Sequence, residues 1–180
     1  MRDGEVRYAP VAIALHWISA VLILCGFTLG LTMTGLEFEP AKFRWYAIHK
    51  WIGITVFLLA FARLAWRTGH PALPPAPMPR WQQRAAAATH ALLYALMLAI
   101  PVSGWIYSSA TGVQVVYLGL FPLPDLVPKD KAAAAALKIV HVTLNYSMAA
   151  LVFVHVWAAL KHRFVDRDAV FARMLPLRWR

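Results

Sequence analysis

Four long apolar stretches with few charges constrain this chain more than any other feature. They cover roughly residues 12–34, 44–66, 86–108 and 133–160. A helix rises about 1.5 Å per residue, so each stretch is long enough to cross a hydrocarbon layer of about 30 Å. Hydrophobic residues make up 61% of the chain and charged residues only 14%, far from the balance of a soluble domain. The sequence therefore predicts an all-α integral membrane four-helix bundle, forming a single domain over residues 1–180.

The first apolar stretch follows a charged start and has to be distinguished from a secretory signal peptide. Its apolar run is longer than the roughly 7–15 residues of a signal core, and no small-residue cleavage site follows it. We expect this stretch to remain in the protein as the first span.

Basic residues predict the orientation of the bundle. The net charge is +10, and basic residues of membrane proteins concentrate on the cytoplasmic side. If both termini are cytoplasmic, the inner segments hold Arg2, Arg7, Arg63, Arg67, Arg80, Arg84, Lys161, Arg163, Arg167, Arg173, Arg178 and Arg180. The outer segments then hold the smaller set of Lys42, Arg44, Lys50, Lys129, Lys131 and Lys138. Topology and anionic lipid thus account for the positive charge without a nucleic-acid partner.

The outer loop between the third and fourth spans is unusually apolar. Its segment VQVVYLGLF is too short to span the membrane, and Pro122, Pro124 and Pro128 interrupt the remainder of the loop. We expect an interfacial segment, which either packs against lipid or covers a buried group.

Histidines are the candidate functional residues, because ionisable side chains inside spans are costly and mark functional sites. His141 and His155 lie in the fourth span, fourteen residues apart, which is about 21 Å along a helix and nearly the same face. His155 is near the inner end and His141 near the outer end. The first span supplies His16 at the inner level, and the second supplies His49 at the outer level.

This arrangement predicts two metal centres, one at each membrane surface. The pairs would be His16 with His155 and His49 with His141, which is what bis-histidine haem ligation between facing helices requires. One zinc site would need three or four ligands in one place, whereas these histidines are divided between two levels. The single cysteine excludes an iron–sulfur cluster, and no C-x-x-C-H motif for covalent haem is present.

Several motifs resemble the bacterial cytochrome b561 family over nearly the whole chain. They are LHW at 15–17, HK at 49–50, HALLYALMLAIPVSGW at 90–105, and two histidines separated by thirteen residues at 141–155. The resemblance implies a multi-pass protein of the bacterial inner membrane with two haem b groups. The residues that match the family's ligands are His16, His49, His141 and His155.

The resemblance also implies electron transfer, in one of two forms. One type in the family is similar to a superoxide:ubiquinone oxidoreductase, which oxidises superoxide at the periplasmic face. Other related subunits anchor a hydrogenase or a dehydrogenase and pass its electrons to quinone. The cations Lys42, Arg44, Lys50 and Lys138 at the outer face favour the first form, since they would attract an anion. Phosphate headgroup contact is the alternative role for them.

Three further residues have assignments of their own, and no catalytic residue is assigned. His162 lies one turn beyond the inner end of the fourth span and is the predicted contact of the ubiquinone headgroup. Arg63, one turn inside the second span, either reaches toward the lipid headgroups or pairs with a haem propionate. His90 in the third span is either an ordinary core histidine or a neighbour of the inner haem or quinone.

Overall fold

Four long helices make up most of the protein. The computed structural model describes residues 7–35, 40–74 and 76–176, so Arg2, Arg178 and Arg180 of the predicted cytoplasmic set lie outside the described residues. The helices are α1 (Pro10–Thr34), α2 (Pro40–Gly69), α3 (Arg80–Thr111) and α4 (Lys131–Lys161). All four are long and apolar enough to cross a membrane. The predicted four-span bundle is confirmed, with each helix extending beyond the apolar stretch that predicted it.

Local sequence signals explain where these helices begin and end. α1 starts with Pro10 in its first turn, where the missing N–H costs nothing. α3 ends at Gly112, whose φ of 76° is the left-handed conformation that glycine adopts without strain. Asp130 precedes α4, and its Oδ1 accepts a hydrogen bond from the Ala133 N–H at 2.9 Å, which is a typical N-cap.

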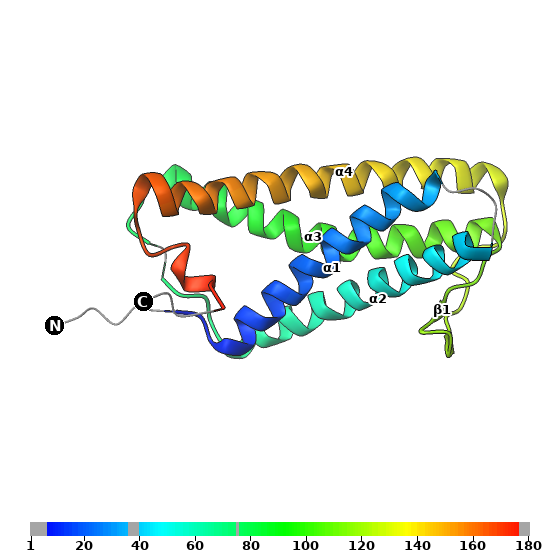
Figure 1. Cartoon of the computed structure of the whole chain (residues 1–180), viewed down its shortest axis with the longest axis horizontal. Helices are drawn as coiled ribbons and strands as arrows, with labels where there is room; N and C mark the ends of the chain where they lie inside the picture. The colour runs from blue at the N-terminus through cyan, green and yellow to red at the C-terminus, as the bar shows by residue number, and fades with distance from the viewer. Residues whose placement is uncertain (1–6, 36–39, 75, 177–180) are drawn as a thin grey trace.

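The helices are arranged so that sequence neighbours pack together. α1 contacts α2, α2 contacts α3, and α3 contacts α4, while α1 runs obliquely from α2 at one end of the bundle toward α4 at the other (Figure 1). A small buried core of Val56, Ala60, Met97 and Met148 joins α2, α3 and α4 near mid-bundle. Many large apolar side chains on the outer faces are exposed, as expected for helices that lipid surrounds.

Both ends of the described chain lie at the same end of the bundle. The Tyr8 N–H donates to the Arg173 carbonyl at 3.2 Å, and we name this the terminal end. Beyond α4 the chain forms a π-helix, η1 (His162–Asp166), and a short 3₁₀ helix, η2 (Ala172–Met174). The chain turns back at Arg167, and the Trp17 Nε1–H then donates to the Met174 carbonyl at 2.7 Å. This C-terminal segment therefore packs against the start of α1.

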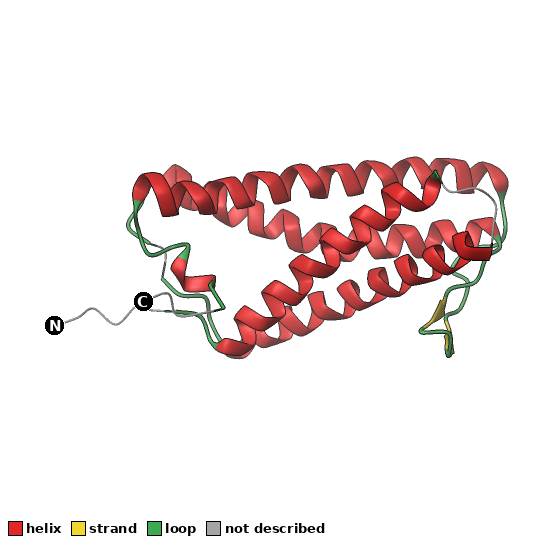
Figure 2. Cartoon of the chain, in the orientation of Figure 1, coloured by secondary structure: helices red, strands yellow, loops and turns green. Residues whose placement is uncertain are grey.

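The opposite end carries a β-hairpin that the sequence did not reveal, and we name it the hairpin end. Strands β1 (Val116–Tyr117) and β2 (Phe121–Pro122) pair in antiparallel register. The hairpin projects sideways from the bundle next to α2 (Figures 1 and 2). Trp51 Nε1–H donates to the Val116 carbonyl at 2.7 Å, and the hydroxyls of Thr55 and Tyr117 lie 3.0 Å apart. The hairpin thus packs on the flank of α2, as an interfacial segment would.

Candidate functional site

One large cavity runs along the bundle, with walls from all four helices. Its volume is about 1200 Å³, above the range of roughly 300–1,000 Å³ that is usual for small-molecule pockets. Apolar side chains dominate the wall, as a membrane bundle predicts. Five histidines also line it: His16, His49, His90, His141 and His155.

The structure brings these histidines together in the two pairs that their spacing predicts. At the terminal end, the ring centroids of His16 and His155 are 6.1 Å apart, with an angle of 62° between the ring planes. At the hairpin end, the centroids of His49 and His141 are 6.3 Å apart, with an interplanar angle of 87°. α4 contributes one histidine to each pair, while α1 and α2 contribute the partners.

The hairpin-end pair is oriented by hydrogen bonds at Nδ1. His49 Nδ1 lies 2.9 Å from the Gly26 carbonyl oxygen. His141 Nδ1 lies 2.9 Å from Ser103 Oγ, and Ser103 Oγ donates to the Ile100 carbonyl at 2.8 Å. Since Nδ1 of each ring is engaged by the protein, Nε2 is the nitrogen that remains for a metal.

Two glycines make room for these rings. A Cβ atom added to Gly104 would lie 2.9 Å from His141 Cε1, and one added to Gly30 would lie 3.3 Å from His49 Cε1. In the structure these two glycines therefore accommodate the histidine rings. A Cβ atom added to Gly53 would have no atom within 4 Å, and Gly53 lines the cavity.

These pairs fit a bis-histidine haem. A metal held between two imidazoles with metal–nitrogen bonds of about 2 Å leaves the ring centroids on the order of 6 Å apart, close to the separation in both pairs. Metal-binding histidines normally donate their other ring N–H to a carbonyl or similar acceptor, as His49 does. The cavity volume and apolar wall suit a large hydrophobic macrocycle.

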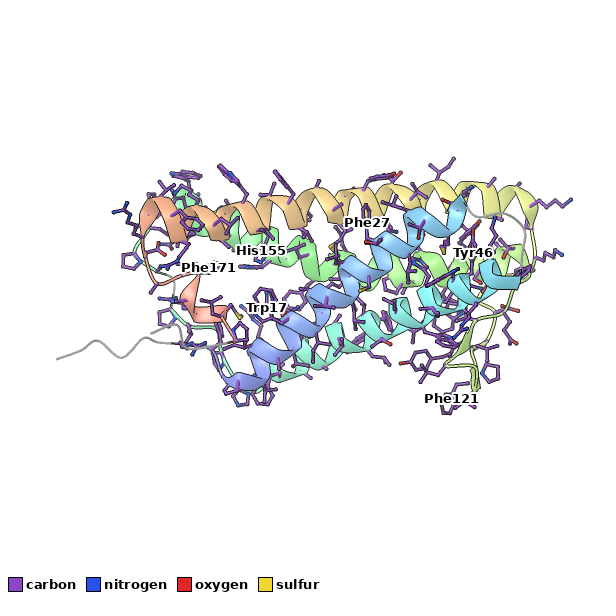
Figure 3. The ribbon with its side chains drawn as sticks, in the orientation of Figure 1. Trp17, Phe27, Tyr46, Phe121, His155 and Phe171 are labelled. Atoms are coloured by element: carbon purple, nitrogen blue, oxygen red, sulfur yellow. The ribbon has the colours of Figure 1, made fainter. Side chains whose placement is uncertain are left out.

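The terminal-end pair has aromatic and cationic neighbours. The His90 ring centroid lies 5.3 Å from that of His155, and Trp17 meets His16 edge-on at 5.5 Å. Figure 3 shows Trp17, His155 and Phe171 gathered at this end. Arg63 lines the cavity with its guanidinium 5.1 Å from the centre of the Tyr94 ring. Arg67, one turn further along α2, lines it as well.

The remaining predicted site residues divide into two groups. Lys42 and Lys50 line the cavity at the hairpin end, whereas Arg44 and Lys138 are exposed and lie outside its described lining. His162 is also outside that lining, in η1. Its Nδ1 lies 2.7 Å from Asp168 Oδ2 and 3.2 Å from Asp166 Oδ2. Lys161 pairs with Asp166 as well, so this group is an ion-pair network at the terminal end.

Sequence patterns alone did not reveal the role of Ser103 or the contacts of the tryptophans. Ser103 and Gly104 belong to the PVSGW motif, whose depth in the third span matches that of His141, and this was the available signal. Trp17, Trp51 and Trp105 each donate an indole N–H to a carbonyl outside the four main helices. They therefore anchor the loops and the C-terminal segment to the bundle.

Comparison with known proteins identifies the family. The family model described as prokaryotic cytochrome b561 matches residues 7–177. Two relatives come from Escherichia coli (strain K12). "Cytochrome b561 homolog 2" is 35% identical, covering 94% of this chain and 91% of its own length. "Cytochrome b561 homolog 1" is 30% identical, with 96% and 98% covered.

A third relative is named for an activity. "Probable superoxide oxidase CybB" of Yersinia pestis is 26% identical and covers 94% of this chain and 96% of its own length. The match over residues 7–177 together with the four spans gives the class of the protein. The chain belongs to the prokaryotic cytochrome b561 family, as a multi-pass protein of the bacterial inner membrane that binds haem b and transfers electrons.

Proposed function

We propose that the protein oxidises superoxide at the periplasmic face and reduces ubiquinone at the cytoplasmic face, with the whole chain acting as one domain. The observation that carries this proposal is the presence of two imidazole pairs at opposite ends of one cavity. A haem b held by His16 and His155, and a second held by His49 and His141, would supply one-electron chemistry with both axial positions filled.

The distribution of basic residues supports a cytoplasmic terminal end. Among the described residues, the cations at this end include Arg7 before α1, Arg67 and Arg80 in the adjoining ends of α2 and α3, and Arg163, Arg167 and Arg173 after α4. Such residues concentrate on the cytoplasmic side. Under this orientation His49 and His141 are at the periplasmic level. The hairpin end is then where an external electron donor would arrive.

Two cations at the hairpin end support an anionic donor. Lys42 and Lys50 line the cavity next to the His49 and His141 pair, and Lys50 directly follows a proposed ligand. Cationic residues in an apolar cleft concentrate an anion and raise its encounter rate. Superoxide is a small anion that can surrender one electron at a periplasmic surface. Arg44 and Lys138 would contribute to the field from outside the cavity.

At the terminal end the chain offers groups for a haem propionate and for a quinone. Arg63 and Arg67 line the cavity beside the aromatic and histidine cluster and are suited to carboxylates. His162 stays our proposed quinone contact. Because Asp168 engages its Nδ1, only Nε2 is left for a quinone oxygen. Donation from both nitrogens requires the protonated ring.

The overall reaction balances without another reactant. Two superoxide anions each lose one electron and become dioxygen. One ubiquinone gains these two electrons and takes two protons from the cytoplasmic side, which gives ubiquinol. The residues of the terminal end therefore have to admit protons as well as quinone, while the hairpin end handles no protons.

The test is turnover by the purified, haem-loaded chain alone. Mixing it with superoxide and a soluble ubiquinone analogue should give ubiquinol in a ratio of one quinol to two superoxide ions. Heat-denatured protein controls for the direct reaction of superoxide with quinone. A loaded protein that shows no rate above this control would contradict the proposed substrate.

The second candidate is a membrane-anchor subunit that passes electrons between quinone and a partner dehydrogenase or hydrogenase. The exposed apolar side chains of the hairpin, including Leu118, Leu120 and Phe121, favour it as a docking surface. Purification in a mild detergent distinguishes the two functions. A stable complex with a periplasmic metalloprotein would support the anchor.

A further inference from the structure

We propose that Ser103 is a positioning residue for His141, and that its hydrogen bond lowers the reduction potential of the haem at the hairpin end. This inference rests on the proposed function, because it takes His141 as a haem ligand. It concerns a residue on α3, the one main helix that supplies none of the proposed ligands.

The direction of the bond follows from counting hydrogens. A serine hydroxyl has one hydrogen, and a carbonyl oxygen can only accept. Ser103 Oγ lies 2.8 Å from the Ile100 carbonyl and 2.9 Å from His141 Nδ1. The hydroxyl therefore donates to Ile100 and accepts from the Nδ1–H of His141. With its hydrogen on Nδ1, the neutral ring presents the lone pair of Nε2.

Burial and packing make this geometry persistent. Ser103 is only 7% exposed and is absent from the described lining of the cavity, so it supports the ring from behind. The next residue, Gly104, leaves the space into which the ring fits, since a Cβ there would lie 2.9 Å from His141 Cε1. Adjacent residues of one helix thus hold the ring nitrogen and accommodate the ring edge.

The two ends of the cavity differ in this respect. His49 also donates from Nδ1, to the Gly26 carbonyl at 2.9 Å. Within the described ranges, no hydrogen bond joins a ring nitrogen of His16 or His155 to the protein.

This difference in hydrogen bonding acts on the reduction potential. An acceptor on Nδ1–H makes the imidazole a more basic ligand, which stabilises ferric over ferrous iron and lowers the potential. Nearby cations raise the potential, but two of them line the cavity wall at each end, Lys42 and Lys50 at the hairpin end and Arg63 and Arg67 at the terminal end, so charge does not distinguish the two sites. The hairpin-end haem should therefore have the lower potential. Electrons that enter there move toward the higher potential, which offsets the cost of moving negative charge toward a negative cytoplasm.

The experiment is an equilibrium redox titration of the haem-loaded protein, followed by visible spectroscopy and resolved into two components. Ser103→Ala removes the acceptor, and Ser103→Thr keeps a hydroxyl. Ser19→Ala is the matched control, because Ser19 is a 1% exposed serine whose hydroxyl donates to the Leu15 carbonyl of its own helix. We expect an upward shift of the lower-potential component in Ser103→Ala, recovery in Ser103→Thr, and no shift of that component in the control.

The outcomes separate this inference from the proposed function. If the wild type holds two haems and Ser103→Ala leaves both potentials unchanged, the role of Ser103 is wrong while the proposed function stands. A shift of the higher-potential component alone also contradicts the inference. If Ser103→Ala loses one haem, recovery of that haem and its potential in Ser103→Thr supports the bond, and loss in both variants contradicts it. A wild type with fewer than two haems contradicts the proposed function itself.

Discussion

His49 on α2 and His141 on α4 lie with their ring centroids 6.3 Å apart and their planes nearly perpendicular, at 87°. Three groups from other helices position these rings. Ser103 and Gly104 of α3 contact the His141 ring, and the Gly26 carbonyl of α1 accepts a hydrogen bond from His49. All four helices therefore contribute to the hairpin end, although only two of them supply the proposed ligands. Substitutions at either end of the cavity can test parts of that arrangement.

Replacing Gly104 by alanine should empty the hairpin-end site. The added Cβ would lie 2.9 Å from His141 Cε1, so the ring has to leave its position and the ligand pair is broken. We expect the haem-to-protein ratio to fall by about half, since the pair at the other end of the cavity is remote. The pyridine haemochrome spectrum measures this ratio. Gly69→Ala is the matched control, because a Cβ atom added to Gly69, the last residue of α2, would have no atom within 4 Å. A Gly104→Ala protein with full haem content would contradict the assigned packing.

The two haems should have different electron paramagnetic resonance signatures. Perpendicular axial imidazoles leave two iron d orbitals nearly equal in energy, which makes the ferric signal strongly anisotropic, and smaller angles reduce the effect. The interplanar angle is 87° for His49 and His141 and 62° for His16 and His155. We therefore expect the larger gmax for the haem that His49→Ala removes. Equal gmax values for both components would show that the rings rotate when haem binds.

Removing the cavity-lining cations should slow reduction by superoxide. The double variant Lys42→Gln with Lys50→Gln removes two positive charges from the hairpin-end wall. At low ionic strength we expect the second-order rate constant to fall by about fivefold to tenfold, within the range that electrostatic steering produces. Stopped-flow spectroscopy of haem reduction gives this constant.

The matched control for this prediction is Arg44→Gln with Lys138→Gln, which removes the same charge from exposed positions outside the described lining. Its effect should be smaller, and both effects should decrease near 0.15 M salt, where the screening length is about 8 Å. Equal losses in the two double variants would mean that net charge matters and the cavity wall does not.

Trp17 should be needed to hold the C-terminal segment. Its Nε1–H donates to the Met174 carbonyl at 2.7 Å, and Trp17→Phe deletes this bond while it keeps an aromatic ring. The lost hydrogen bond should cost about 1 kcal/mol of local stability. Faster amide exchange across residues 168–176 would report it. Trp81→Phe changes a tryptophan that is 68% exposed and should leave this exchange unchanged. The same protection in both variants would contradict the anchoring role.

The variant His90→Phe tests whether His90 is itself a haem ligand or only a neighbour of the proposed ligand His155. Its centroid lies 5.3 Å from that of His155, whereas the proposed partner of His155 is His16 at 6.1 Å. We expect this variant to keep both haems and to alter the absorption or potential of the terminal-end component only. Loss of a haem in His90→Phe but not in His16→Ala would show that His90 is the ligand.

The levels of the histidines were predictable from sequence, because helix rise and the alternation of spans place residues along the membrane normal. Fourteen residues of α4 separate His141 from His155, and this spacing, together with the levels of His16 and His49, predicted two sites. The bonds of Ser103 were not predictable in this way. They depend on how α3 is rotated against α4, which no local pattern records.

The ends of the bundle were the least predictable parts. The motif VQVVYLGLF indicated an interfacial segment, but its hairpin depends on the contacts of Val116 with Trp51 and of Tyr117 with Thr55, which come from another helix. The π-helix η1 is held by local contacts, since His162 pairs with Asp166 and Asp168, four and six residues further along the chain. The hairpin, in contrast, takes its conformation from tertiary partners.

The most direct test of two paired sites is the haem-to-protein ratio of single His→Ala variants, combined with the reduced-minus-oxidised spectrum of each. The wild type should hold two haem b groups. His16→Ala and His155→Ala should lose one and the same spectral component, while His49→Ala and His141→Ala should lose the other. A single haem in the wild type, or the same component lost in all four variants, would contradict the account.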